Sequence, residues 1–217
     1  MNKIMNPSDV CKISDLPANP IEMFNTLIKR AGVKYIPMNL ATVDSEFCVL
    51  NRTIVYRGLT DNSEICFVTE RNSRKYKNLK ANPKSALTIL LNIGLEEENR
   101  ETWQIRLMNA CAVEIDDQAI LSKFWQEEPL FAKIRSHIVE CGKPMNHEEL
   151  ILKHNKLLAN YQSGQNTLEQ SPSYTAFKIL PKLWDFYKSE PGKIADRVQY
   201  KLCDNKVNEW TTYHVAA

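Results

Sequence analysis

The sequence predicts a mainly β protein with some α structure, in which an antiparallel β-barrel carries appended helices. Many short runs rich in β-branched and aromatic residues are joined by short, turn-prone links, which is typical of antiparallel sheets. The fingerprints G-x-G-x-x-G and G-x-x-x-x-G-K are absent from the sequence, so nothing favours a parallel nucleotide-binding sheet.

Composition bounds the remaining possibilities. The 217 residues are 43% hydrophobic and 25% charged, enough for one domain with a real core. We expect a flexible N-terminal arm over 1–18 and a single domain over 19–215, with a helical segment at 116–160 and dimerisation strands at 173–215. The net charge of +2 is too small to indicate nucleic-acid binding by itself. Six widely spaced cysteines, with no signal sequence or membrane span, lead us to expect a cytoplasmic protein.

In the N-terminal half, Asn19-Pro20-Ile21-Glu22 has the residues of a helix start, and the helix is expected to end near Gly32. Three strands are expected to follow as an antiparallel meander, at 38–43, 47–57 and 65–69. A short basic helix then begins at the capping residue Ser73 and runs toward Ala81.

The C-terminal half resumes the β pattern. Strands are expected at 85–91 and 102–115, joined by the acidic link 96–101. Residues 116–156 are rich in helix formers and are interrupted at 142–144, and a polar, mobile loop is expected over 162–172. Four strand candidates close the chain, at 174–180, 183–187, 197–203 and 209–215.

The basic helix is the first candidate binding element. Between Arg71 and Lys84 there are six basic residues and no acid. Arg74 and Lys75 fall in the first turn, where the helix dipole disfavours each cation by roughly 0.3 to 1 kcal/mol. A solvated helix face is the ordinary explanation of such a run. The alternative is a phosphate site, since helix N–H groups, guanidinium and ammonium groups all bind a dianion.

Five quoted stretches carry a family resemblance. "NRTIVYRG", "ICFVTERNSRK", "ANPKSAL", "WQIRL" and "LWDFYKSEPGKIADR" resemble, in order and spacing, the pyridoxamine 5'-phosphate oxidase family, over roughly residues 19–215. The resemblance implies a split barrel that binds FMN at the interface of a homodimer. It also implies that the anion at the basic helix is the 5'-phosphate of FMN.

The resemblance assigns roles to particular residues. It implies FMN contacts by Arg52, Thr53, Ile54, Val55, Tyr56, Arg57, Val68, Thr69, Arg74, Lys75, Gln104, Cys141, Gly142, Tyr187 and Arg197. Arg52 with Arg74 and Lys75 would bind the phosphate, Gln104 would bind the flavin ring, and Arg197 would come from the partner subunit. Arg197 and Lys193 would be the catalytic cations. Arg57, Phe124 and Lys193 would contact a small-molecule substrate, and no metal site is expected.

Some departures from the family pattern, at Cys141-Gly142 and Tyr187, are tolerable for cofactor binding, but those on the substrate side are more serious. Glu128 and Ala132 stand where the family has an arginine and a serine that hold the substrate phosphate, and Ala195 stands where it has a histidine. A carboxylate at that place would repel a phosphate. Lys133 and Arg135 lie nearby and could replace the lost arginine if the helix register shifts. The chain therefore looks like a diverged paralogue.

Three functions remain open. The first is an FMN-dependent oxidase that forms pyridoxal 5'-phosphate from pyridoxamine or pyridoxine 5'-phosphate, with O2 as acceptor. The second is a flavin- or ligand-binding paralogue without that activity, and the third is an FMN oxidoreductase with a different substrate. Nucleic-acid binding by 71–84 has only local charge in its favour, and no membrane partner is expected.

Overall fold

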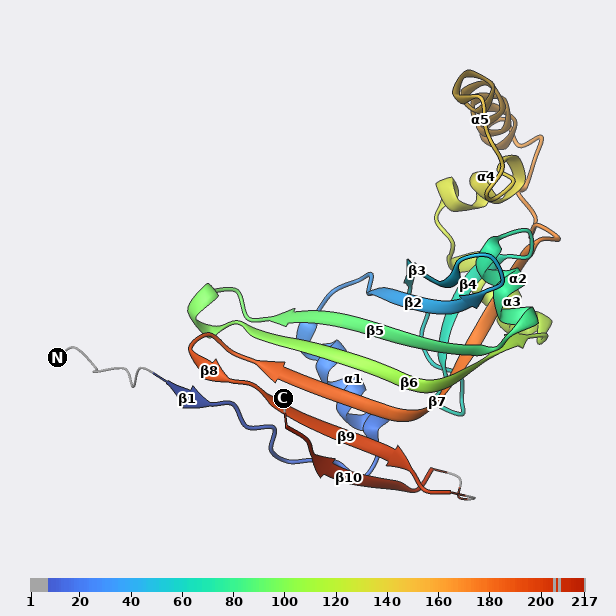
Figure 1. The fold of residues 1–217 in the computed structure, drawn as a ribbon. Coiled ribbons are helices and arrows are strands. Elements are labelled where there is room, and N and C mark those ends of the chain that lie inside the picture. Colours follow the sequence, from blue (N-terminus) through green and yellow to red (C-terminus); the bar gives the residue numbers. More distant parts are fainter. Residues whose placement is uncertain (1–7, 205, 207, 217) are drawn as a thin grey trace.

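The computed structural model describes residues 8–204, 206 and 208–216, and its main feature is one large antiparallel sheet (Figure 1). The strands are β1 (Asp9–Val10), β2 (Pro37–Asp44), β3 (Cys48–Val55), β4 (Ile65–Glu70), β5 (Lys84–Ile93), β6 (Glu101–Ile115), β7 (Tyr174–Ser189), β8 (Lys193–Ile194), β9 (Asp196–Leu202) and β10 (Trp210–His214). The α-helices are α1 (Pro20–Ala31), α2 (Arg74–Ala81), α3 (Gln118–Glu127), α4 (Leu130–Ile138) and α5 (His147–Gln162). A 3-10 turn, η1, covers Glu97–Asn99.

The long strand β7 bends the sheet into a barrel. The strand order is β10-β9-β7-β6-β5-β2-β3, and β4 pairs with the first half of β7 while β9 pairs with its second half. The sheet is not closed, but the chain just beyond β3 meets the start of β4, where the Arg57 N–H donates to the Cys66 carbonyl and the Cys66 N–H to the Gly58 carbonyl, each at 2.9 Å. The predicted split barrel is confirmed, with an open side between β3 and β4.

The core follows the alternation of the strands. On β2, Met38 and Leu40 point inward and are fully buried, because successive side chains of a strand face opposite sides. Helix α1 begins at Asn19, whose side chain accepts a hydrogen bond from the Ile21 N–H, and ends at Gly32 with φ +61°. It seals the core through Phe24, whose ring centroid lies 5.5 Å from that of Trp184.

The other helices lie at one end of the sheet. Helix α2 buries Leu79, and α3 covers a second apolar cluster that includes Phe124 and Trp125. Helices α4 and α5 form a hairpin that stands away from the sheet, at the top right of Figure 1. In the described part of the chain, no helix combines the length and the apolar character needed to cross a bilayer.

The expectation of a flexible arm over 1–18 is wrong for residues 8–18, which the structure describes. Strand β1 pairs with β8, and both Cys11 and Ile13 are buried, the latter in the main core. Residues 1–7 of the expected arm lie outside the described residues. The polar loop expected over 162–172 is also anchored, because the Leu168 side chain is buried and its carbonyl accepts a hydrogen bond from Trp125 Nε1 at 3.1 Å.

Two predictions about strands need correction. The expected meander is wrong at its third strand, because β4 pairs with β7 and not along β3. The strand candidates 174–180 and 183–187 form the single strand β7. Pro181 lies between Ile179, the last residue of the β4 ladder, and Leu183, the first of the β9 ladder. A proline is tolerated where a strand changes partners in this way.

Candidate functional site

A cavity with a volume of about 540 Å³ lies at the open side of the barrel. This is within the range of roughly 300 to 1,000 Å³ that small-molecule sites occupy. Its walls come from β3, β4, the start of α2 and the segment from α3 to α4. The lining residues are Tyr35, Thr53, Ile54, Val55, Arg57, Val68, Thr69, Glu70, Lys75, Glu128, Pro129, Phe131, Ala132, Arg135, Cys141 and Tyr174.

Strand β3 forms one wall because it is the last strand of its ladder. Its register with β2 occupies one edge from Cys48 to Val55, and the other edge has no strand partner among the described residues. An unpaired edge offers main-chain N–H and C=O groups to whatever lies beside it. The cavity lies there, so a ligand can take the place of the missing strand.

One end of the cavity is cationic. Ser73 caps α2 by accepting a hydrogen bond from the Tyr76 N–H at 3.3 Å, and Lys75 in the first turn donates to Thr69 Oγ1 at 3.3 Å. Burial lowers the pKa of Lys75, and the charges of Arg52 and Arg135 lower it further, against the opposite effects of Cys141 and Glu70. The positive charges of Arg52 and Arg135 are therefore close enough to Lys75 to disfavour its protonated form.

Arg52 reaches this region from inside the barrel. Its guanidinium donates to the Leu40 carbonyl at 3.1 Å and to Thr42 Oγ1 at 2.7 Å, and burial lowers its pKa. It is not one of the residues that line the cavity. The structure therefore places Arg52 behind Lys75, where it adds positive potential without touching the cavity wall.

Arg74 points away from the cavity, so it does not join Lys75 at the phosphate site expected from the sequence. Its Nε lies 2.7 Å from Asp44 Oδ2, its Nη2 lies 2.9 Å from Asp44 Oδ1, and it also pairs with Glu46. The guanidinium lies 4.5 Å from the centroid of the Phe47 ring. This pairing holds the pKa of Asp44 well below its usual range. The cation that the helix dipole disfavours is thus compensated by carboxylates of the β2–β3 turn.

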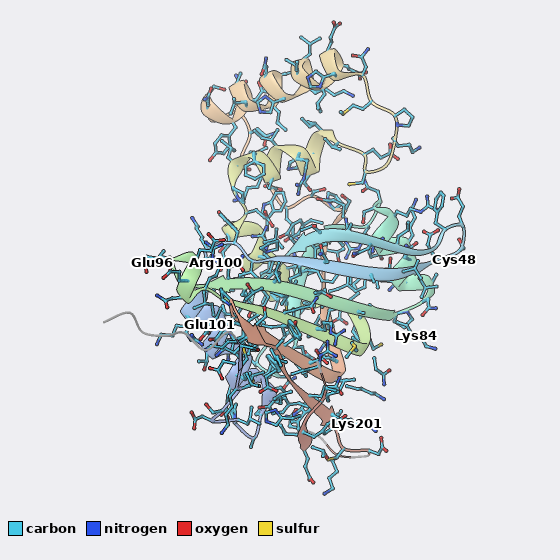
Figure 2. All side chains as sticks on the ribbon, turned by 60° about the vertical axis from the view of Figure 1, so that its left-hand side comes forward. Cys48, Lys84, Glu96, Arg100, Glu101 and Lys201 are labelled. Carbon is cyan, nitrogen blue, oxygen red and sulfur yellow. The ribbon has the colours of Figure 1, made fainter. Side chains whose placement is uncertain are left out.

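The acidic link between β5 and β6 has no part in this compensation. In Figure 2, Glu96, Arg100 and Glu101 lie at one end of the sheet, whereas Cys48 and Lys84 mark the opposite end. Cys48 follows the β2–β3 turn, and Lys84 follows α2. The charges around α2 are therefore balanced locally.

The other end of the cavity is closed by a buried ion pair. Arg57 Nη2 lies 2.7 Å from Glu128 Oε1, and the Tyr174 hydroxyl donates to the same oxygen at 3.1 Å. The Glu128 side chain is only 2% exposed. Burial raises the pKa of Tyr174, and the neighbouring Glu128 raises it further. Within the described residues, Arg57 Nε and Glu128 Oε2 have no hydrogen-bond partner.

A second buried carboxylate, Glu70, lines the cavity between these two ends. Its oxygens accept hydrogen bonds from Ser136 Oγ at 2.7 Å and from Ser173 Oγ. Glu70 and Tyr174 are register partners in the β4–β7 ladder, so the pairing of two distant strands brings both residues to the cavity. Sequence reasoning missed both, because the only local signal was a polar residue at the end of a strand.

The remaining expected flavin contacts form a second group on the sheet. Gln104 on β6 is the register partner of Tyr187 on β7, which is the partner of Arg197 on β9. The Arg197 guanidinium lies 5.4 Å from the centroid of the Tyr187 ring. None of the three lines the cavity. We call these three residues the sheet-face group.

Four other expected site residues also lie outside the cavity wall. Lys193 is on β8 and pairs with Glu190. Tyr56 points into the core, with its ring centroid 5.6 Å from that of Phe24, and burial raises its pKa to about 12. Phe124 is buried in the cluster under α3, so the structure gives no support to its expected substrate contact. Gly142 follows Cys141 in a turn, with φ +79°.

No protein-family model matches the chain. Among curated proteins, the chain is 26% identical over 187 residues to a pyridoxine/pyridoxamine 5'-phosphate oxidase of Bordetella petrii, covering 84% of this chain and 83% of that protein. It is 24% identical over 202 residues to the protein of the same name from Paraburkholderia phytofirmans, covering 91% and 89%.

Two solved structures share the fold. PhzG from Burkholderia lata, crystallised with tetrahydrophenazine-1-carboxylic acid, superposes with a TM-score of 0.76 at 19% identity, covering 96% of this chain and all of that one. A pyridoxamine 5'-phosphate oxidase-related, FMN-binding protein from Nostoc punctiforme superposes with a TM-score of 0.64 at 20% identity, covering 90% and 96%. The fold and the resemblance expected from the sequence are confirmed.

Proposed function

We propose that this chain, a diverged relative of the pyridoxamine 5'-phosphate oxidases, binds FMN and oxidises a small-molecule substrate beside it. The observation that carries the proposal is the cationic end of the cavity. Lys75 lies there in the first turn of α2, within electrostatic reach of Arg52 and Arg135. Helix N–H groups and side-chain cations that converge on one cavity end match a phosphate.

The residues present fit FMN. A bound dianion would reverse the unfavourable interaction among the three cations, and the Thr69 hydroxyl beside Lys75 offers a further hydrogen bond. The unpaired edge of β3 provides main-chain partners for the polar edge of a flavin ring. A cavity of about 540 Å³ also leaves room for a small second ligand.

When bound, FMN would supply a hydride acceptor, and the protein would supply binding and orientation. Lys75 and Arg135 would hold the phosphate. Arg57, Glu128 and Tyr174 would form the wall that faces the substrate. Tyr35 and Phe131 present apolar surface to the same cavity and would reduce the access of water to it.

We further propose that the functional unit is a homodimer whose cavity is completed by the partner's sheet-face group. Gln104, Tyr187 and Arg197 do not line the cavity of their own chain. Leu90, the register partner of Gln104 on β5, is 58% exposed, and Tyr35 at the cavity is 56% exposed. A second copy that covers this face of β5 and β6 would bury Leu90 beside Gln104.

The first test is the cofactor content of the protein as purified. We expect a yellow protein that releases one flavin per chain and elutes as a dimer. A colourless protein that cannot be loaded with FMN would contradict the proposal. Oxygen consumption with pyridoxamine 5'-phosphate, compared with an Arg197→Ala variant, then tests whether the substrate is a vitamin B6 phosphate.

One observation favours a second candidate, a flavin-binding protein that does not turn over vitamin B6 phosphates. Arg57, the cation expected to touch both flavin and substrate, is already paired with Glu128. A dimer fully loaded with FMN that consumes no oxygen with pyridoxamine 5'-phosphate would exclude the vitamin B6 oxidase. The cytoplasmic location expected from the sequence belongs to the same proposal.

A further inference from the structure

We propose that the substrate end of the cavity selects a molecule without a phosphate, namely a neutral or cationic compound, because Glu128 neutralises Arg57 there. The proposal rests on the proposed function, because it assumes that FMN occupies the cationic end. It makes Glu128 the residue that decides the charge class of the substrate.

The distribution of charge along the cavity is the first step. Among the described residues, its lining contains three cations, Arg57, Lys75 and Arg135, and two carboxylates, Glu70 and Glu128. Lys75 and Arg135 lie at one end and are reinforced from behind by Arg52. At the other end, Glu128 neutralises Arg57 at 2.7 Å. Arg57 is therefore not free to bind a second phosphate, and Lys75 and Arg135 are the lining cations that remain for the phosphate of FMN.

The hydrogen-bond inventory is the second step. A carboxylate only accepts hydrogen bonds. Glu128 Oε1 accepts from both Arg57 and Tyr174, whereas Oε2 is buried and has no donor within the described residues. Both Glu128 oxygens are thus turned away from solvent, one held by Arg57 and Tyr174 and the other without a donor in the described part of the chain. The carboxylate therefore acts on a ligand through its charge, which neutralises Arg57 and repels a phosphate dianion.

Burial is the third step, because it determines how strongly this preference acts. The Glu128 and Arg57 side chains are 2% and 19% exposed, so water screens their charges weakly. Placing an anion beside a buried carboxylate is a like-charge contact that excludes the wrong ligand. A phosphate could only gain by displacing Glu128 from Arg57, which would leave that carboxylate without its counter-ion.

The test uses two probes that differ only in the phosphate, pyridoxamine and pyridoxamine 5'-phosphate. Each is titrated into wild-type protein saturated with FMN, and binding is followed by the flavin absorbance and by calorimetry. We expect pyridoxamine to bind at least about tenfold more tightly. Tighter binding of pyridoxamine 5'-phosphate to the wild-type protein would overturn the proposal.

A pair of variants isolates the role of Glu128. Glu128→Gln removes the charge at nearly constant volume, so we expect binding of pyridoxamine 5'-phosphate to strengthen by about tenfold or more relative to pyridoxamine. Glu101→Gln makes the same change at a carboxylate that pairs with Arg30 and Lys188, outside the cavity lining. It should leave the ratio of the affinities for pyridoxamine and pyridoxamine 5'-phosphate unchanged.

The remaining outcomes are also decisive. If neither probe binds to the wild-type protein and Glu128→Gln gains no affinity for pyridoxamine 5'-phosphate, the proposal fails. If Glu128→Gln does not fold, as judged by its thermal unfolding, the wild-type comparison decides alone. A protein that cannot be loaded with FMN defeats the proposed function, whereas an unfavourable ratio in a loaded protein defeats only the charge selectivity.

Discussion

The cavity and the sheet-face group contain residues expected to bind the same cofactor, yet they differ in burial and in how the fold brings their residues together. The cavity brings together Lys75, Thr69 and Arg57 from separate segments of the chain, and burial lowers the pKa of Lys75. The sheet-face group is a single row across three adjacent strands, where Arg197 stacks on Tyr187 outside any part of that cavity. In the proposed dimer, one chain would hold two half-sites.

The difference separates what a chain can do alone from what needs a second copy. The cationic end already has the helix terminus, the hydroxyl groups and the positive charges that a phosphate requires. The sheet-face group has only a cation and two polar or aromatic side chains on a flat surface, too few to hold a ligand. We therefore expect substitutions in the cavity to remove flavin outright, and those on the sheet face to act through the dimer.

The largest effect is expected from Lys75→Glu. Reversing the charge beside the expected phosphate replaces an attractive contact by a repulsive one in a partly buried site, so flavin affinity should fall at least about a hundredfold. The measurement is the flavin content of the purified variant and its affinity for added FMN.

Lys77→Glu is the matched control, because it makes the same change on an exposed residue of the same helix that does not line the cavity. It should retain flavin. Equal loss of flavin in both variants would mean that the overall charge of α2 matters, and not the position of Lys75.

A mixture of two defective variants tests the second half-site. If each site combines Lys75 of one chain with Arg197 of the other, a hybrid of Lys75→Glu and Arg197→Ala chains contains one intact site. Random mixing after refolding should then restore flavin binding to about a quarter of all sites. Two variants that do not complement each other would mean that each site takes both residues from one chain, or that the protein is not a dimer.

Local signals in the sequence predicted much of the fold. Alternating apolar residues marked β2, β5 and β6, and Asn19 and Ser73 marked the starts of α1 and α2 with the capping contacts that the structure shows. The pairing of β4 with β7 was not predictable in this way, because it joins residues about a hundred positions apart. The inclusion of Glu70 and Tyr174 in the cavity depends on that pairing.

The sequence predicted which backbone segments carry the candidate site, but not where each side chain points. Lys75 and Arg74 are adjacent in the first turn of α2, and the sequence placed both at the phosphate. The structure directs one to the cavity and the other to Asp44, since neighbouring residues on a helix point about 100° apart and the β2–β3 turn provides carboxylates. Which side chain meets which partner required the tertiary structure.

A smaller effect is expected from Leu90→Asp on the exposed face of β5. Because Leu90 is 58% exposed, the substitution should change the free energy of unfolding of a single chain by no more than about 0.5 kcal/mol. In a dimer that buries this face, it should shift the equilibrium toward monomer and weaken flavin binding. Sedimentation velocity measures the first effect, and FMN titration the second.

Leu95→Asp provides the comparison for Leu90→Asp. Leu95 is 99% exposed in the link between β5 and β6, away from the sheet-face group. It should leave both the association state and flavin affinity unchanged. If Leu90→Asp behaves like this control, the exposed face of β5 is not the interface, and the sheet-face group needs another explanation.

The smallest effect concerns Arg74, whose pairing with Asp44 keeps it out of the cavity. The pKa of Asp44 lies below its unfolded value, so the pair stabilises the folded protein above about pH 4, and this stabilisation is lost as the pH falls through the folded-state pKa. Asp44→Asn should therefore lower the free energy of unfolding at pH 7, and its difference from wild type should shrink in acid. Urea unfolding at pH 7 and at pH 3 measures both, with Asp61→Asn at an exposed turn as the control. A difference that persists undiminished at pH 3 would mean that the ionised form of Asp44 is not what stabilises the fold, and that pairing with Asp44 is not what keeps Arg74 out of the cavity.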